Sequence, residues 1–203
     1  MAKHRILLNS IQLLLMHIIR EHFEQIVNLD NRDWEIFSSK IIKSEHPKKN
    51  ILLHVCQTEK YLSFIERGSV RFYIPKLEHE LTFGFCFDNQ FVSAYDSFLR
   101  QIPSNYQIET LSETILWRIS YKDLQDVYVH SEIGNTIGRL AAESLFLIKS
   151  EREYSLLNLT AEERYLSLFE KRPNLIKEIP LKYFASYIGI TPQALSRIRK
   201  RIS

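Results

Sequence analysis

The chain has 203 residues, of which 45% are hydrophobic and 25% are charged, as in an ordinary globular protein that can bury one core or two small ones. Its two cysteines, Cys56 and Cys86, form no CxxC motif and are too few for a zinc ribbon or an iron–sulfur cluster. We therefore expect two reduced thiols in a cytoplasmic protein. The net charge of +3 does not by itself indicate a nucleic-acid partner.

The chain begins with an apolar-rich stretch, residues 6–19, behind two basic residues. Polar residues interrupt this stretch and it is too short to span a bilayer, which argues against membrane targeting. Two interpretations stay open. Either residues 1–20 form an additional amphipathic helix, or residues 1–15 are an extension upstream of a true start at Met16.

Two helices are predicted next, over residues 15–27 and 30–43. Asp30 can cap the second helix, which has an apolar stripe formed by Trp34, Phe37 and Ile41. The cluster at residues 47–50 then breaks the helical period.

From residue 50 the sequence consists of short segments rich in β-branched and aromatic residues, which are typical of strands. Glu66, Arg67 and Gly68 predict a tight turn between two of them. So many short strands in about seventy residues favour a double-stranded β-helix or jelly roll, in an α+β protein. The predicted strands are residues 50–55, 61–65, 69–74, 81–87, 90–93, 106–111 and 114–119.

Helical patterns return with a short helix at residues 122–128 and a long one at 131–157. Along one face of the long helix runs a stripe in which mostly apolar residues recur at alternating steps of four and three positions. This spacing resembles that of a coiled coil. A core helix could show the same stripe, but we expect this one to form a homodimer. The stripe consists of Ile133, Ile137, Leu140, Ser144 and Leu147.

After the long helix, residues 160–163 (TAEE) read as a capping box that opens a helix to about residue 170. Residues 172–174 end that helix. Residues 175–180 can then form a short strand, the element that would make the following unit a winged helix-turn-helix.

Residues 179–202 have the pattern of a helix-turn-helix. Phe184 and Ile188 mark the buried side of the first helix, and Gly189 supplies a turn position where a positive φ is tolerated. Thr191 can cap the second helix. The inward stripe of this second helix consists of Leu195, Ile198 and Ile202.

The opposite face of the second helix is polar and basic, as a DNA major groove requires. No acidic residue occurs from Ala185 to Ser203, so we expect no neighbour to neutralise its arginines. Residues 160–203 hold nine Lys or Arg against four Asp or Glu, whereas the rest of the chain is slightly acidic. The alternative is an ordinary surface hairpin with a solvated basic face. The predicted DNA-binding residues are Thr191, Gln193, Ser196, Arg197, Arg199, Lys200 and Arg201.

The order of helix, β-roll, long helix and C-terminal winged helix-turn-helix resembles the Crp/Fnr family of bacterial transcription regulators. The motifs that carry this resemblance are residues 64–71 (FIERGSVR), 159–165 (LTAEERY) and 188–199 (IGITPQALSRIR). The resemblance implies a homodimer that binds a two-fold symmetric operator and contacts RNA polymerase. It also implies a base-reading role for Gln193 and Arg197, and we expect Arg197 to be the main specificity residue.

The resemblance also divides the chain into parts. After the helical extension at residues 1–20, it implies a cyclic-nucleotide-binding-like sensor roll at 21–128 and a dimerisation helix at 129–158. The winged helix-turn-helix would occupy residues 159–203.

The sensor roll departs from the cyclic-nucleotide binders of this family. Their phosphate cassette carries Gly-Glu near its start and an arginine near its end, and residues 87–98 have neither. Cyclic AMP is therefore not expected as the effector. Iron–sulfur sensing is excluded by the cysteine count.

The roll is rich in aromatic residues, which are either ordinary core packing or a pocket for an apolar small molecule that the sequence does not identify. Phe83, Phe85 and Phe87 alternate and are expected on one face of a strand. The candidate pocket consists of Phe83, Phe85, Phe87, Phe91, Tyr95 and Arg100.

The sequence leaves two alternative classes of function. One is a small-molecule-binding roll with weak or vestigial DNA binding. The other is an enzyme on a jelly-roll scaffold, such as a cupin, which would need metal-binding histidines that have no His-x-His pattern here. We therefore expect no enzyme activity, no cofactor and no metal.

Overall fold

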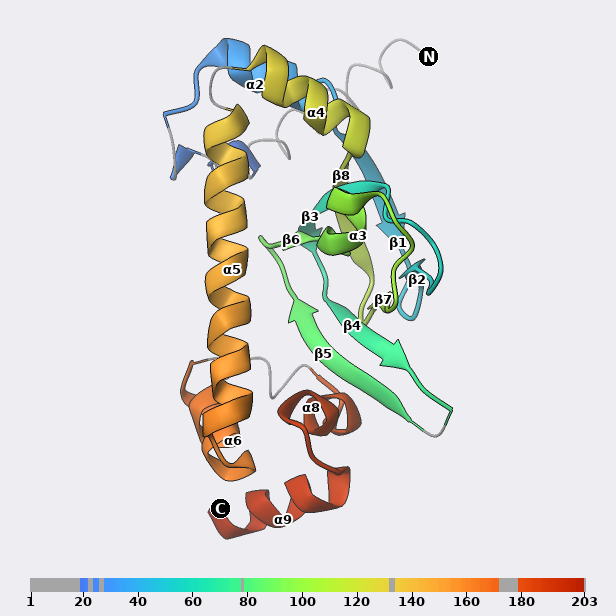
Figure 1. Ribbon diagram of the computed structural model, residues 1–203, viewed down its shortest axis with the longest axis vertical. Coiled ribbons are helices and arrows are strands. Elements are labelled where there is room, and N and C mark those ends of the chain that lie inside the picture. Colours follow the sequence, from blue (N-terminus) through green and yellow to red (C-terminus); the bar gives the residue numbers. More distant parts are fainter. Residues whose placement is uncertain are drawn as a thin grey trace.

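The computed structural model describes residues 19–21, 24–25, 28–77, 79–131, 134–171 and 179–202. Two antiparallel sheets form a β-roll, and a long helix runs along one side of it (Figure 1). Helices α2 and α4 lie at one end of the molecule, and α6, α8 and α9 lie at the other (Figure 1). The predicted α+β architecture with a jelly roll is confirmed.

Each sheet has four strands, and all the pairings are antiparallel. The first sheet, sheet A, has the order β1 (Ile42–His46), β8 (Thr114–Ser120), β3 (Tyr61–Arg67) and β6 (Phe91–Val92). The second, sheet B, has the order β2 (Ile51–Leu53), β7 (Gln107–Thr110), β4 (Val70–Pro75) and β5 (Glu80–Cys86).

The prediction of a helix over residues 30–43 was wrong in its second half. Helix α2 spans only Asn31–Ser38, with the carboxylate of Asp30 accepting from the N–H of Asp33 at 2.7 Å, as a cap should. From Ile42 the chain is instead β1, which pairs with β8. The pairing partner lies about seventy residues away, so no local signal in the sequence announces this strand.

The turn at Gly68 joins β3 to β4, but it is not the β-hairpin that its sequence suggests. Strand β3 pairs with β8 and β6, whereas β4 pairs with β5 and β7, so the chain crosses here from sheet A to sheet B. Gly68 has φ +115°, and a Cβ there would lie 2.5 Å from the hydroxyl oxygen of Thr114. This corner therefore requires glycine.

The remaining elements are helical, and the predicted helices after the roll are confirmed. The short helix α3 was not predicted. The expected strand at 175–180 falls almost entirely outside the described residues, as does most of the expected helix at 15–27. The helices are α3 (Tyr95–Arg100), α4 (Tyr121–His130), α5 (Gly134–Asn158), α6 (Ala161–Lys171), α8 (Leu181–Ile188) and α9 (Pro192–Ile202).

Three hydrophobic clusters hold the roll together, and one of them lies between the two sheets. It includes Leu53, Ile65, Ile108 and Leu116. The other two pack the outer side of sheet A against the helices, around Trp117 and around Phe98 respectively. Among the described residues, none of the helices combines the length and the apolarity that crossing a bilayer requires.

Candidate nucleic-acid interface

Helices α8 and α9 are joined by a turn whose geometry follows from its residues. Gly189 adopts a left-handed conformation, with φ +81°. Its N–H bonds to the carbonyl of Ser186, and the N–H of Ile190 bonds to that of Ala185, which is the pattern of a glycine-terminated helix. The hydroxyl of Thr191 accepts from the N–H of Ala194 at 3.2 Å and so caps α9.

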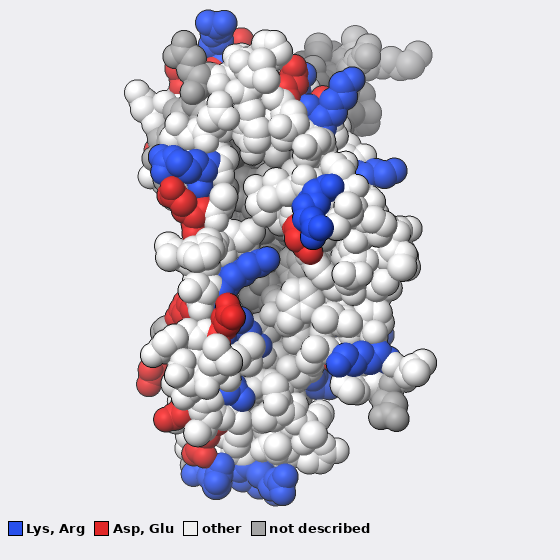
Figure 2. All heavy atoms as spheres, viewed as in Figure 1, with Lys and Arg blue, Asp and Glu red and all other residues white. Residues whose placement is uncertain are grey.

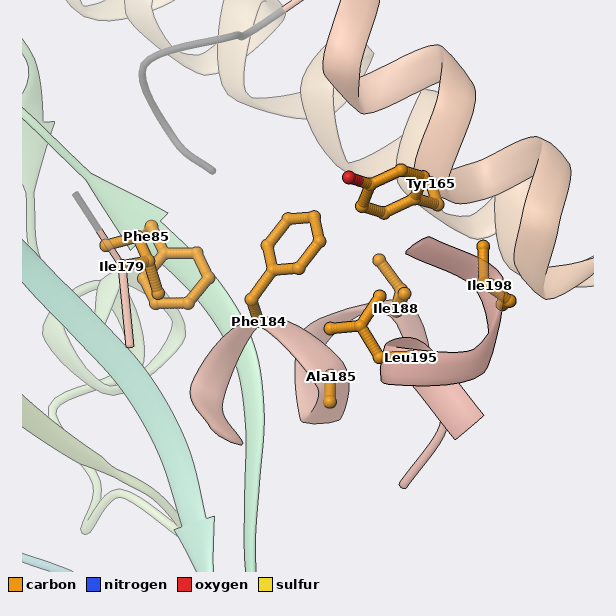
Figure 3. Close-up of a cluster of buried hydrophobic side chains, with 8 residues drawn as sticks. All are labelled: Phe85, Tyr165, Ile179, Phe184, Ala185, Ile188, Leu195 and Ile198. Carbon is orange, nitrogen blue, oxygen red and sulfur yellow. The ribbon is translucent and has the colours of Figure 1, made fainter. Parts of the chain in front are cut away.

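The two helices cross over one apolar cluster, to which α6 and β5 also contribute (Figure 3). Phe184, Ala185, Ile188 and Leu195 are at most 1% exposed. Ala185 is fully buried in this cluster, and its small side chain leaves room for the side chains of α9. Ile202, which was expected to face inward, is 41% exposed, because it lies at the end of α9 beyond this cluster.

The outward face of α9 brings the predicted DNA-binding residues together. All six of those on the helix are exposed, and Thr191 lies immediately before it. Figure 2 shows basic side chains gathered at this end of the molecule. A groove of about 620 Å³ runs beside the helix, lined by Ala161, Ile190, Ala194, Arg197, Ile198, Lys200 and Arg201.

One expectation about this face was wrong. Although α9 itself has no acidic residue, Glu162 of α6 contacts Arg201, with a distance of 2.6 Å between Oε2 and Nη2. The packing of α6 beside α9 brings this carboxylate close, and the sequence of α9 alone could not reveal it. Arg201 is therefore already paired, so the unbalanced positive charge is less than predicted.

Two arginines that the sequence analysis missed fix the end of α8. Arg152 of α5 donates to the carbonyl of Tyr187 and stacks over its ring, with 3.8 Å between Cζ and the ring centroid. Arg164 of α6 donates through Nε to the carbonyl of Ile188 at 2.9 Å, and through Nη1 to that of Leu159. These bonds satisfy carbonyls that a helix end leaves without partners.

The other side of α8 rests on sheet B of the roll. The hydroxyl of Ser186 accepts from the N–H of Thr82 at 2.9 Å and donates to the carbonyl of Glu80 at 3.1 Å. The rings of Phe85 and Tyr187 lie 5.2 Å apart. Helix α8 is therefore bonded to the roll as well as to α5 and α6.

Arg71 of β4 lies at the centre of this contact and is 1% exposed. Its Nε lies 2.6 Å from Glu109, and its Nη1 lies 2.8 Å from Glu80. The guanidinium lies between two rings, 3.9 Å from that of Tyr73 and 3.7 Å from that of Tyr183 on α8. Burial alone would lower the pKa of Arg71, but the hydrogen bonds to the two carboxylates raise it above its ordinary value.

The candidate effector residues are not brought together into one site. Strand β5 has a bulge, because Phe72 pairs with Gly84 and Tyr73 pairs with Thr82, which leaves Phe83 without a partner residue. The alternation that would put three rings on one face is therefore broken.

The rings of β5 accordingly go to different clusters. Phe83 packs against Tyr106 with 5.0 Å between centroids, whereas Phe85 packs against Phe87 and against α8. Phe91 packs against Phe64 on the helical side of sheet A. Tyr95 stacks on Phe98 in a further cluster, and Arg100 is exposed at the end of α3.

Helix α5 exposes apolar side chains along much of its length. Of the predicted dimer stripe, Ile133 and the side chains of Ile137, Leu140 and Ser144 lie outside the described residues, and Leu147 is 65% exposed. Other exposed apolar residues of α5 are Phe146 at 69%, Ile148 at 50%, Tyr154 at 68% and Leu157 at 78%.

The fold defined by these elements is that of the Crp/Fnr regulators. No family model matches the chain, and no curated protein matches it. Among solved structures, the c-di-GMP responsive global regulator CLP from Xanthomonas campestris is 18% identical, with 85% of this chain and 91% of that chain covered and a TM-score of 0.68.

Two further solved structures support the same fold. FixK2 from Bradyrhizobium japonicum is 14% identical over 80% of this chain and 84% of that chain, with a TM-score of 0.69. A protein from Eubacterium rectale that is described as a transcriptional regulator of the Crp/Fnr family is 18% identical over 85% and 83% of the two chains, with a TM-score of 0.65. At such identities the likeness is one of fold.

Proposed function

We propose that this protein is a sequence-specific transcription regulator that binds DNA through α9. The observation that carries the proposal is the α9 helix itself, whose apolar side is buried while its Gln, Ser, Arg and Lys side is exposed. The helix lies at one end of the molecule on a platform bonded to three other elements. An exposed helix on a fixed platform can enter a major groove with little loss of conformational freedom.

Arg197 is the residue we propose to read a base. It lies near the middle of the exposed face of α9, and arginine can bond to guanine through two donors at once. Gln193 lies one turn earlier on the same face and would read an adjacent base. The other predicted contacts, to phosphates, are Thr191, Ser196, Arg199, Lys200 and Arg201, of which Arg201 would first have to exchange Glu162 for a phosphate.

The protein would act as a homodimer that covers the exposed apolar residues of α5. A 25-residue helix with Leu147, Tyr154 and Leu157 each more than half exposed is poorly covered by its own chain. A second copy packed along the helix would bury them, together with the predicted stripe. It would also provide a second α9, as an inverted-repeat operator requires.

The roll would be the sensor, within residues 21–128, followed by the dimerisation helix at 129–158 and the DNA-binding unit at 159–203. A ligand that shifts the conformational population of the roll would change how the α5 helices pack. Ser186 and Arg71 add a direct route, because they bond α8 to sheet B. RNA polymerase would be a further partner, and the proposal includes no enzyme activity and no cofactor.

The proposal is tested by selecting genomic DNA fragments with the purified protein at one near-physiological salt concentration. Wild type should enrich an inverted repeat, and Arg197→Ala should weaken its binding about 10- to 100-fold, the effect of losing one bidentate base contact. Arg67→Ala removes an exposed arginine from the roll and is the matched control, which should enrich the same repeat as wild type. Equal, salt-sensitive binding by all three proteins would contradict the proposal and favour a roll with vestigial DNA binding.

A further inference from the structure

Strand β8 carries an arginine on the side that faces the inside of the roll. Successive residues of a strand point to opposite faces. Trp117 and Ile119 pack against the helices outside sheet A, whereas Leu116 belongs to the cluster between the two sheets. Arg118 therefore shares the inner face with Leu116.

This arginine is part-buried, but no carboxylate of the described residues forms an ion pair with it. Its guanidinium stacks over the ring of Tyr61, with 4.1 Å between Cζ and the ring centroid. Its Nε is buried and has no hydrogen-bond partner in the part of the chain that the structure describes. Burial lowers the pKa of Arg118 from its ordinary value, and the charge of nearby Glu59 raises it only in part.

Glu59 is held by backbone N–H groups instead, and among the described residues no hydrogen bond or ion pair joins its carboxylate to Arg118. One oxygen accepts from the N–H groups of Lys60 and Tyr61, each at 3.0 Å, and the other accepts from that of Ala94 at 3.4 Å. The carboxylate is thus held by backbone groups at the start of β3 and just before α3. It balances part of the charge of Arg118 from a distance, but it does not bond to Nε.

A part-buried guanidinium is energetically unfavourable when one of its N–H donors has no hydrogen-bond acceptor, unless a bound molecule supplies one. We propose that Arg118 anchors a binding site for a small anionic molecule, on the inner face of sheet A. The ligand would present a carboxylate or a phosphate to Nε and one Nη, since two oxygens fit the edge of a guanidinium whose face is stacked on a ring.

Arg118 lies between a buried and an exposed neighbour in sheet A. It is opposite Ser63 of β3, which is 4% exposed, and opposite Ile42 of the edge strand β1, which is 53% exposed. The side of the edge strand is the one from which the anion would approach. The inference rests on the proposed function in one respect, because it makes this anion the effector of the sensor roll.

The site is tested first without DNA, by thermal unfolding of the full chain in phosphate, acetate or chloride at constant ionic strength and pH. A ligand at ten times its Kd should raise the Tm of wild type by about 3–5 °C relative to chloride. Arg118→Gln should lose this rise, and Arg118→Lys, which keeps the charge but not the paired donors, should retain only part of it. Arg67→Gln is the control at an exposed arginine of the same roll and should respond like wild type.

The two anions distinguish a phosphate ligand from a carboxylate ligand. An equal rise in Tm in all four proteins, or no rise in wild type with either anion, would overturn the site.

Operator binding is then measured with and without the active anion. A change in wild type that Arg118→Gln lacks would support the effector role. Anion binding at Arg118 with unchanged operator affinity would keep the site but overturn its link to the proposed regulator.

Discussion

Arg71 and Arg118 are arginines of the same roll, and the chain surrounds them in opposite ways. Arg71 is on the outer face of sheet B, where two carboxylates and two tyrosine rings enclose it. Arg118 is on the inner face of sheet A, with one ring beside it and no carboxylate in contact among the described residues. The pKa of Arg71 is raised by its partners, whereas burial lowers that of Arg118.

The difference indicates what each arginine does. The interactions of Arg71 are complete within the chain, and they include α8, so this residue joins the roll to the helices that carry α9. Among the described residues, the buried Nε of Arg118 has no acceptor, and a buried donor without an acceptor is unfavourable. One arginine stabilises the structure, and the other is suited to an external partner.

The largest expected effect comes from replacing Arg71. Arg71→Met leaves Glu109 nearly buried beside Glu80 with no cation between them, and it removes the contact with Tyr183. Removing one member of a buried charge network costs about 3 kcal/mol or more, so we expect a loss of that size in the free energy of unfolding. Urea denaturation measures the loss, and hydrogen exchange should also become faster in α8.

The same substitution at Arg118 is the matched control. Arg118→Met removes a cation for which the described residues provide no ion-pair partner, so the free energy of unfolding in an anion-free buffer should change little or increase. Equal losses for Arg71→Met and Arg118→Met would mean that the two environments do not differ as the contacts indicate.

A smaller effect is expected at Ser186, which makes the polar contact of α8 with β5. Ser186→Ala leaves the N–H of Thr82 without its acceptor at a residue that is 1% exposed. An unpaired buried donor costs about 1–2 kcal/mol, which urea denaturation resolves. Operator affinity should fall as well, because α8 loses a bond that positions α9.

The control for this substitution is Ser196→Ala, on the exposed face of α9. Its free energy of unfolding should stay within about 0.5 kcal/mol of wild type, as is usual for surface substitutions. If Ser186→Ala behaves in the same way, the bonds between α8 and β5 contribute nothing to stability, and the direct route from the roll to α9 is wrong.

The sequence predicted the features that short-range chemistry determines. Gly189, Thr191 and the apolar stripes of α8 and α9 are local signals, and each has the structural role that its position indicates, except for Ile202 at the end of the α9 stripe, which is exposed. The two-sheet roll was predicted in the same way, from the period of its short strands.

The features that were missed depend on residues far apart in the chain. Ser186 bonds to residues more than one hundred positions earlier, and Arg201 meets a carboxylate of another helix. The bulge at Phe83 depends on the register between β4 and β5. It separates the rings of Phe83 and Phe85, which are close together in the sequence. Arg118 lies on β8, outside the cassette at residues 87–98 in which the family resemblance places an arginine, and only the folded roll shows that β8 faces the same interior.

The smallest effect concerns the capping box before α6, which the sequence predicted and the structure contains. The N–H of Glu163 donates to the hydroxyl of Thr160 at 3.3 Å, and the carboxylate of Glu163 accepts from the N–H of Thr160 at 2.7 Å. Thr160→Ala should cost about 1 kcal/mol in the free energy of unfolding near neutral pH, less than the loss expected at either buried contact.

This cost should depend on pH. The N–H and hydroxyl of Thr160 hold the pKa of Glu163 below its ordinary value, so the stabilisation is present above the unfolded pKa of about 4.3 and is lost as pH falls through the lower, folded value. The gap between wild type and Thr160→Ala in urea denaturation should therefore narrow from pH 7 to about pH 3. Glu163→Gln keeps an acceptor but no charge, so in that background the effect of Thr160→Ala should not change with pH. A gap that stays constant with pH when Glu163 is present would mean that the bond from the hydroxyl of Thr160 to the ionised carboxylate contributes nothing to the cap.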